Sequence, residues 1–299
     1  VVTDVIQSNF MKVFGSVIVA AINILIAYFI KKLVRRERHT HLSTESAQVV
    51  VLILFGQFMN TSVIIILIYL RFPGTQSSPT PFLFNGEYDD FGVGWYTIVA
   101  VFIQTTIFIS ALSSHAVFLI NYLFIKPNRR RKARLDPEHY NTQQELNNAV
   151  IPKGFPLEQR VAAQLLLVAV PVVFSPGMPM LLIIGAIGIL IGICMDKLDL
   201  ARHSPHPPPV DATLARSMIE VLPTLIVSRL MFASWVFTNP SIFASVQDDS
   251  TEKLQAVLQK NDPVGLSRRL SNPAAVPHVI VLSLLLTYLA IRIFVWPFF

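Results

Sequence analysis

Polar side chains recur inside stretches of this chain that are otherwise apolar, and their chemistry is hydrogen bonding to water, to one another or to hydrated ions. The richest stretch runs from residue 104 to residue 115, and a second polar turn surrounds residues 57 to 62. Positions 106, 110, 113 and 114 recur at helical spacing, so one helical face is polar over about two turns. The candidate pore-lining residues are Gln57, Asn60, Gln104, Thr106, Ser110, Ser114 and His115.

Two interpretations of these residues stay open. In a membrane, Ser, Thr and Asn side chains commonly form hydrogen bonds between neighbouring helices. Polar groups in hydrocarbon also line paths for water or for hydrated solutes. Helix packing explains each residue taken alone, whereas a whole polar face on one helix favours the hydrated path.

An arginine inside another apolar stretch is the second candidate feature. An unpaired charge near the centre of a bilayer costs at least about 2.5 kcal/mol, so Arg229 must face the bundle interior, a water cavity or a carboxylate. Glu220 is nine residues earlier, which is about 13–14 Å along a helix at ~1.5 Å per residue. It becomes a partner only if Pro223 breaks the helix between them.

Prolines and glycines mark the third candidate feature, a gating hinge made of Pro176, Gly177, Pro179 and Gly185. Gly188 and Gly192 extend the glycine spacing, which places small residues on one helical face. Such a face serves close packing of helices, and it also permits bending or sliding. The sequence favours packing, and the two roles are compatible.

Catalytic motifs do not stand out. There is no glycine-rich phosphate loop, no HExxH motif, no nucleophile elbow and no pair of carboxylates inside an apolar stretch. We therefore expect no enzymatic activity, no cofactor and no metal site.

The elements that hold these residues are predicted to be membrane-spanning helices. Residues Val161 to Met195 form 35 consecutive residues without a charge, interrupted by Ser175-Pro176-Gly177-Met178-Pro179. One span needs ~20 apolar residues, so this stretch predicts two spans and a tight turn. The predicted fold is an all-α, polytopic transmembrane helix bundle that forms a single transmembrane domain over residues 1–299. About seven spans are expected, or six if the fourth and fifth form a re-entrant pair: residues 10–30, 47–70, 93–125, 157–174, 178–195, 217–237 and 278–299.

Basic residues predict the orientation. Three segments that alternate correctly with the spans hold 16 of the 24 Lys and Arg residues: 31–38, 126–160 and 197–216. Because such loops stay on the cytoplasmic side, the N-terminus is predicted outside and the C-terminus inside. The net charge of +6 is then a property of the inner face and no sign of nucleic-acid binding. The organelle stays open. The chain does not begin with Met, so we expect a processed or partial chain.

Several short motifs in order resemble the membrane region of the OSCA-type stress-gated cation channels, which form a superfamily with the anoctamins and the transmembrane channel-like proteins. They are Glu37-Arg38-His39-Thr40, Gln57-Phe58-Met59-Asn60-Thr61, Asp90-Phe91, Trp95-Tyr96, Ser114-His115, Phe155-Pro156-Leu157-Glu158-Gln159-Arg160, the hairpin from Phe174 to Pro179, Asp196-Lys197 and Pro208-Pro209-Val210-Asp211. The resemblance implies a pore within each subunit, along a groove formed by spans one to five. It also implies conduction of cations, or movement of lipid headgroups, in response to tension or calcium.

The chain departs from that superfamily in two ways. The calcium site of the anoctamins needs several acidic residues on adjacent spans, and spans two to five have none at depth. The large cytoplasmic domain of stress-gated channels is missing; either it precedes Val1 or the chain is a reduced relative. We expect the pore region of a mechanosensitive, weakly selective cation channel. Its partners would be membrane lipids, permeating cations and a second copy or larger membrane assembly. The alternatives are a structural subunit without transport of its own and a lipid scramblase.

Overall fold

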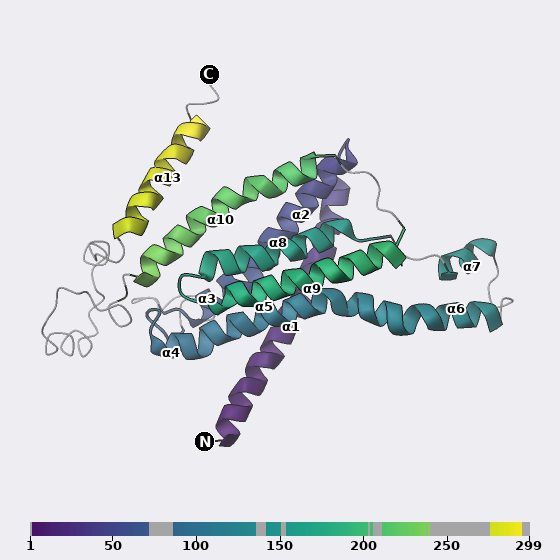
Figure 1. Cartoon of the computed structure of the whole chain (residues 1–299), viewed down its shortest axis with the longest axis horizontal. Helices are drawn as coiled ribbons and strands as arrows, with labels where there is room; N and C mark the ends of the chain where they lie inside the picture. The colour runs from purple at the N-terminus through teal and green to yellow at the C-terminus, as the bar shows by residue number, and fades with distance from the viewer. Residues whose placement is uncertain are drawn as a thin grey trace, which may run out of the picture. The chain divides into compact units, whose positions relative to one another are not determined.

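The computed structural model describes residues 2–71, 86–135, 142–150, 154–202, 204–205, 211–237, 239 and 276–294, and these are almost entirely helical, with no strand among them (Figure 1). The elements are α1 (Val2–Val34), η1 (Arg35–Glu37), α2 (Leu42–Phe58), η2 (Met59–Val63), α3 (Ile64–Tyr69), α4 (Val93–Trp95), η4 (Tyr96–Ala100), α5 (Val101–Ile120), η5 (Asn121–Ile125), α6 (Lys126–Leu135), α7 (Gln143–Val150), α8 (Leu157–Phe174), α9 (Met180–Arg202), α10 (Thr213–Phe237) and α13 (Val276–Phe294).

Six of the described helices are long and apolar enough to cross a membrane, which confirms the all-α membrane fold. They are Phe10–Glu37, Leu42–Tyr69, Val93–Lys132, Leu157–Phe174, Met180–Ala201 and Thr213–Phe237. The protein is therefore a multi-pass membrane protein. The seventh predicted span corresponds to α13, whose described apolar part, Val276–Tyr288, is shorter than the other six. Residues 295–299 of that prediction lie outside the described residues.

The uncharged stretch forms the predicted pair of helices. Helix α8 ends at Phe174 and α9 begins at Met180. Pro176 and Pro179 have no backbone N–H, so neither can continue the hydrogen-bond ladder of α8. The last turn closes instead through Met178, whose backbone N donates to the Phe174 carbonyl at 2.9 Å. Each helix is a separate candidate span.

The third span is longer than predicted. A charged segment was expected to begin after Ile125, yet the helix continues through α6 to Leu135. Charge alone does not end a helix, because Lys and Arg are good helix formers. Pro127 has no N–H, so it cannot donate to the Leu123 carbonyl four residues earlier. That carbonyl lies in η5, where the helix has a π-helical turn in place of a regular α-helical one.

Backbone contacts group the chain into two units. The first comprises residues 1–61, 105–168 and 183–219, and the second comprises residues 62–104, 169–182 and 220–299. The prediction of a single transmembrane domain stays a prediction.

The first unit has an aliphatic core near the basic ends of its helices. Val34, Val50 and Ile53 are fully or almost fully buried, and Ala162 and Leu214 join them from α8 and α10. In the same unit α9 packs against α5 and α8, because a Cβ added at Gly188 would lie 3.0 Å from both the Ala111 Cβ and the Leu167 Cδ1. These side chains hold the unit together by close packing of small and branched residues.

The second unit has an aromatic core. The Phe91 and Trp95 rings meet edge to face with centroids 4.6 Å apart, and the Phe232 ring lies 5.3 Å from Phe91 and 4.9 Å from Phe174. Trp95 is fully buried. Asn239 is bonded to the same core, because its Nδ2 donates to the Phe91 carbonyl at 2.8 Å.

Candidate functional site

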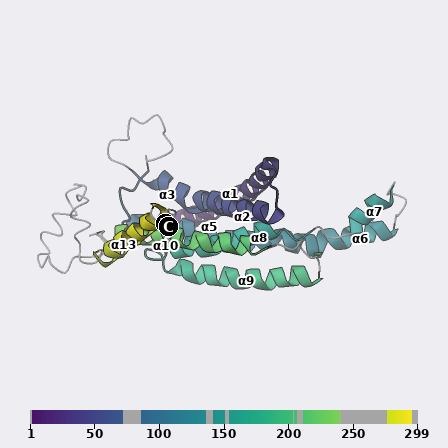
Figure 2. The same cartoon turned by 90° about the horizontal axis from the view of Figure 1, so that it is seen from above.

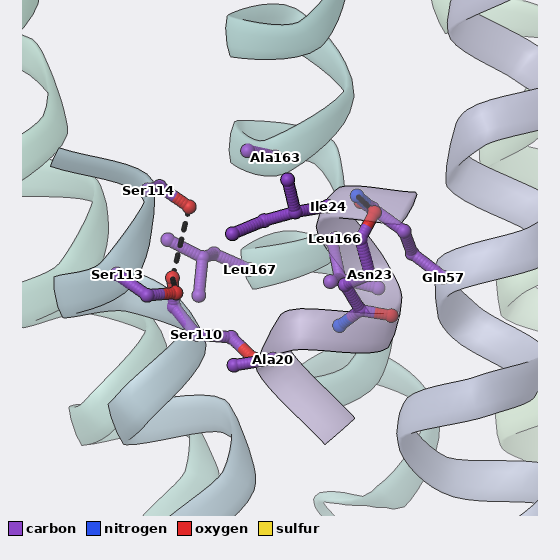
Figure 3. Close-up of a pocket in the computed structure, with 10 residues that line it drawn as sticks. All are labelled: Ala20, Asn23, Ile24, Gln57, Ser110, Ser113, Ser114, Ala163, Leu166 and Leu167. Atoms are coloured by element: carbon purple, nitrogen blue, oxygen red, sulfur yellow. Dashed lines mark hydrogen bonds between the residues drawn. The ribbon is translucent and has the colours of Figure 1, made fainter. Parts of the chain in front are cut away.

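A small cavity, partly open and of mixed polar and apolar lining, lies in the first unit between α1, α2, α5 and α8 (Figure 3). Its volume is about 50 Å³. One buried water needs ~10–15 Å³ on this measure, so the cavity has room for roughly three. The lining residues are Ala20, Asn23, Ile24, Gln57, Ser110, Ser113, Ser114, Ala163, Leu166 and Leu167.

The α1–α2 side of the cavity is a network of amides. Asn23 Nδ2 donates to Thr61 Oγ1 at 3.0 Å, and Asn60 Nδ2 donates to Asn23 Oδ1 at 2.9 Å. Gln57 Nε2 donates to the Asn23 carbonyl at 3.2 Å, which leaves Gln57 Oε1 buried and without a hydrogen-bond partner in the described part of the chain. The π-helical turn η2 begins at Met59 and contains Asn60 and Thr61.

The α5 side of the cavity is built from three serines. The Ser110 carbonyl accepts from Ser113 Oγ at 3.1 Å and from Ser114 Oγ at 2.8 Å. Ser110 Oγ is buried, and no described group pairs with it. Leaving a buried polar group unpaired costs about 1–3 kcal/mol. Two such oxygens, Ser110 Oγ and Gln57 Oε1, therefore favour water in the cavity.

The candidate pore residues fall into different surroundings, and only some of them line the cavity. Gln57, Ser110 and Ser114 line the cavity. Asn60 and Thr106 are buried in bonds between helices, since Thr106 Oγ1 lies 2.9 Å from Ser16 Oγ. Gln104 is half-buried and belongs to the second unit.

His115, the last of the candidates, belongs to an ionic cluster that sequence reasoning missed. Arg160 Nη1 donates to His115 Nδ1 and to the Ser114 carbonyl, both at 2.7 Å. Arginine only donates, so Nδ1 accepts and the ring is neutral with its proton on Nε2. The guanidinium also faces two carboxylates, with Nε 3.5 Å from Asp196 Oδ1 and Nη2 3.9 Å from Asp199 Oδ2. Arg160 thereby joins α5, α8 and α9.

A signal for this cluster was present in the sequence. Arg160 directly precedes the uncharged stretch and Asp196 directly follows it. When a hairpin folds back at its middle, its two ends come level. We assigned Arg160 to a basic loop, whereas its side chain is about nine-tenths buried.

A second ionic contact joins α1, α2 and α8 in the same unit. Lys31 Nζ lies 3.0 Å from Glu158 Oε2, and Ser46 Oγ donates to Glu158 Oε1 at 3.3 Å. The pair is only partly exposed. Both charges lie at helix ends that the basic segments 31–38 and 126–160 predict to be cytoplasmic.

The hinge candidates lie in two places. Pro176, Gly177 and Pro179 form the turn between α8 and α9, where a Cβ added at Gly177 would lie 2.9 Å from the Tyr96 hydroxyl. Gly185 is buried within α9, which continues unbroken from Met180 to Arg202. At Gly192 an added Cβ would collide with the Gln164 amide. The glycine face of α9 is a packing face.

Arg229 finds neutral partners. Its Nη1 donates to the Val172 carbonyl at 3.0 Å and also bonds Ser175 Oγ. In a regular helix the Val172 carbonyl would accept from residue 176, but Pro176 has no N–H to give. Helix α10 continues unbroken through Pro223, contrary to the break considered above, and Glu220 is exposed. Arg229 pairs with no carboxylate among the described residues.

Comparisons with known proteins give no assignment: no family model, no curated protein and no solved structure matches this chain. The resemblance to the OSCA-type channels therefore stays a hypothesis that rests on the short motifs. Of these motifs, residues 208–210 lie outside the described residues.

Proposed function

We propose that this chain is the pore region of a stress-gated, weakly selective cation channel of the OSCA type. The observation that carries the proposal is the pair of buried, unpaired oxygens, Gln57 Oε1 and Ser110 Oγ, at the cavity between four helices. A passing cation sheds part of its water shell, and neutral oxygens replace those waters. None of the cavity-lining residues carries a fixed charge, which fits weak selectivity among cations.

The cavity of about 50 Å³ is too small for a continuous water path, so this arrangement represents a closed pore. Opening requires the helices around it to separate. The turn at Pro176, Gly177 and Pro179 supplies the movable element, because it joins α8 and α9 without a continuous hydrogen-bond ladder. Two positions of that hairpin would differ in the membrane area they occupy, and tension favours the larger.

The test is current from the purified chain in liposome patches while suction stretches the membrane. We expect stepwise currents that rise with tension. Gln57→Leu and Ser114→Leu should lower the unitary current, because each replaces an oxygen at the cavity with an apolar group. The matched control is Thr106→Val, which alters a buried hydroxyl that does not line the cavity. Unitary currents that stay unchanged in both Leu variants would refute the assignment of the pore lining.

A structural subunit without transport of its own is the second candidate. It is favoured by the hydrogen bonds that already pair most buried polar groups, such as Ser16 with Thr106 and Asn23 with Thr61. Silence in the patch, with the protein folded and inserted, would favour it. A fluorescent-lipid flip assay on the same vesicles separates both candidates from a scramblase.

A further inference from the structure

Helix α6 concentrates positive charge where the third span leaves the apolar region. It contains six basic residues and no acidic one: Lys126, Arg129, Arg130, Arg131, Lys132 and Arg134. Within the first unit, α6 continues the line of α5 and projects past the ends of α8 and α9 (Figures 1 and 2). The basic residues are therefore presented on an extension of the span.

The residues just before α6 mark the edge of the hydrocarbon. Tyr122, Leu123 and Phe124 are exposed, and Phe124 is 68% accessible. Exposed apolar side chains on a membrane helix face lipid, and Tyr commonly marks the interface. Lys126 follows directly. The charged helix thus starts at the interface, and its 10 residues reach about 15 Å at ~1.5 Å per residue.

That reach matches the layer of lipid headgroups. Bilayers measure ~40–45 Å with headgroups against ~30 Å for the hydrocarbon, so each headgroup layer is about 5–7 Å thick. Arg129, Arg130 and Arg131 lie about 4.5–7.5 Å along the helix from Lys126. All three fall in or just beyond the layer that contains the lipid phosphates.

Four consecutive charges of α6 are also unpaired among the described residues. Arg129, Arg130, Arg131 and Lys132 are exposed, and none forms an ion pair with a described carboxylate. Asp136 and Glu138 follow in the sequence and lie outside the described residues. Even if both offset a basic residue, residues 126–138 keep a positive excess.

We propose that α6 is a docking arm for anionic phospholipid headgroups in the leaflet at its end of the span. Arginine binds phosphate through two parallel N–H donors, and a basic cluster beside a span gains affinity from each charge near an anionic surface. The arm would enrich phosphatidylserine-type lipids around the third span. This proposal needs only a membrane protein and is independent of channel activity.

Spin-labelled lipids test the arm on the full chain. The chain is reconstituted in phosphatidylcholine vesicles, and electron paramagnetic resonance measures the motionally restricted fraction of labelled phosphatidylserine against labelled phosphatidylcholine. We expect about a five-fold preference for phosphatidylserine. It should vanish in a four-site variant of α6: Arg129→Gln, Arg130→Gln, Arg131→Gln and Lys132→Gln. It should also collapse near 1 M salt, where the screening length falls to ~3 Å.

The matched control removes four exposed basic residues elsewhere in the first unit: Lys32→Gln, Arg36→Gln, Lys197→Gln and Arg216→Gln. The control should keep the preference. If the preference for phosphatidylserine falls equally in both variants, it is a diffuse effect of charge and the proposal is wrong. An unchanged preference in the α6 variant would also refute the proposal. If the four-site variant fails to fold, the milder double variant Arg129→Gln with Arg131→Gln should still lower the preference for phosphatidylserine, and an unchanged preference in that variant would contradict the proposal.

Discussion

The two units of the chain hold their helices together with different kinds of contact. In the first unit, polar and charged side chains form contacts between helices, including the Asn23 amide network and the Arg160 cluster, and two oxygens remain unpaired beside a cavity. In the second unit, aromatic rings around Trp95 make the contacts, and the charge of Arg229 is held by a carbonyl and a hydroxyl.

This difference matters because lipid supplies little hydrophobic driving force between helices, so packing and hydrogen bonds must hold the bundle together. The edge-to-face rings around Trp95 fix the shape of the second unit. Amides and hydroxyls can exchange a protein partner for water at low cost. The first unit is therefore suited to change its hydration, whereas the aromatic core of the second anchors the Pro176–Pro179 turn about which the hairpin is proposed to move. Four predictions test that contrast.

The largest effect is expected for Arg160→Leu. It removes the guanidinium that faces Asp196 and Asp199, and breaking a buried ion pair costs about 3–5 kcal/mol. The free energy of unfolding, measured by titration with dodecyl sulfate in mixed micelles, should fall by that amount. Arg216→Leu is the control, because Arg216 is exposed. Equal losses in the two variants would mean that the cluster adds no stability.

Trp95→Ala should come next. The indole is fully buried between Phe91 and Tyr96, and truncating a buried Trp costs about 3 kcal/mol or more through the cavity it leaves. Met231→Ala removes a side chain of the same unit that is 58% exposed and should change little. Thermal unfolding followed by circular dichroism compares the two. Similar melting temperatures would show that the rings do not hold the unit.

A smaller loss is expected for Gly188→Val. The added side chain meets Ala111 and Leu167, and overpacking a close contact costs about 1–3 kcal/mol. Ala186→Val adds comparable bulk to the exposed face of the same helix. Detergent-unfolding curves should shift for Gly188→Val alone. If both variants unfold alike, the glycine face of α9 is no packing face.

The smallest effect is expected for Thr61→Val, which removes the acceptor of Asn23 Nδ2 without changing shape. Hydrogen bonds between membrane helices average about 0.6 kcal/mol. A double-mutant cycle with Asn23→Ala measures the coupling directly. Thr287→Val, on the exposed face of α13, serves as the control. A coupling near zero would show that the amide network gives no stability.

Sequence periodicity and the uncharged stretch were sufficient to predict the helices of the bundle and the position of the hairpin. They also identified Gln57, Ser110 and Ser114, which line the cavity. They could not separate these from Thr106 or Asn60, because whether a hydroxyl or amide meets water or another helix depends on which helices are neighbours. The burial of Arg160 does not follow from the sequence, because a charge beside an apolar stretch predicts the edge of the membrane.

The bond between Arg229 and Val172 has a consequence for how the chain is made. Synthesis delivers residue 172 before residue 229, so the carbonyl that loses its helical donor at Pro176 precedes the charged helix along the chain. Inserting an arginine at mid-helix costs about 2.5–3.5 kcal/mol, and the Val172 carbonyl, which also accepts from Ser175 Oγ, offers the guanidinium a hydrogen bond against that cost. Reversing the order of these two segments would require the charge to enter the bilayer without its acceptor.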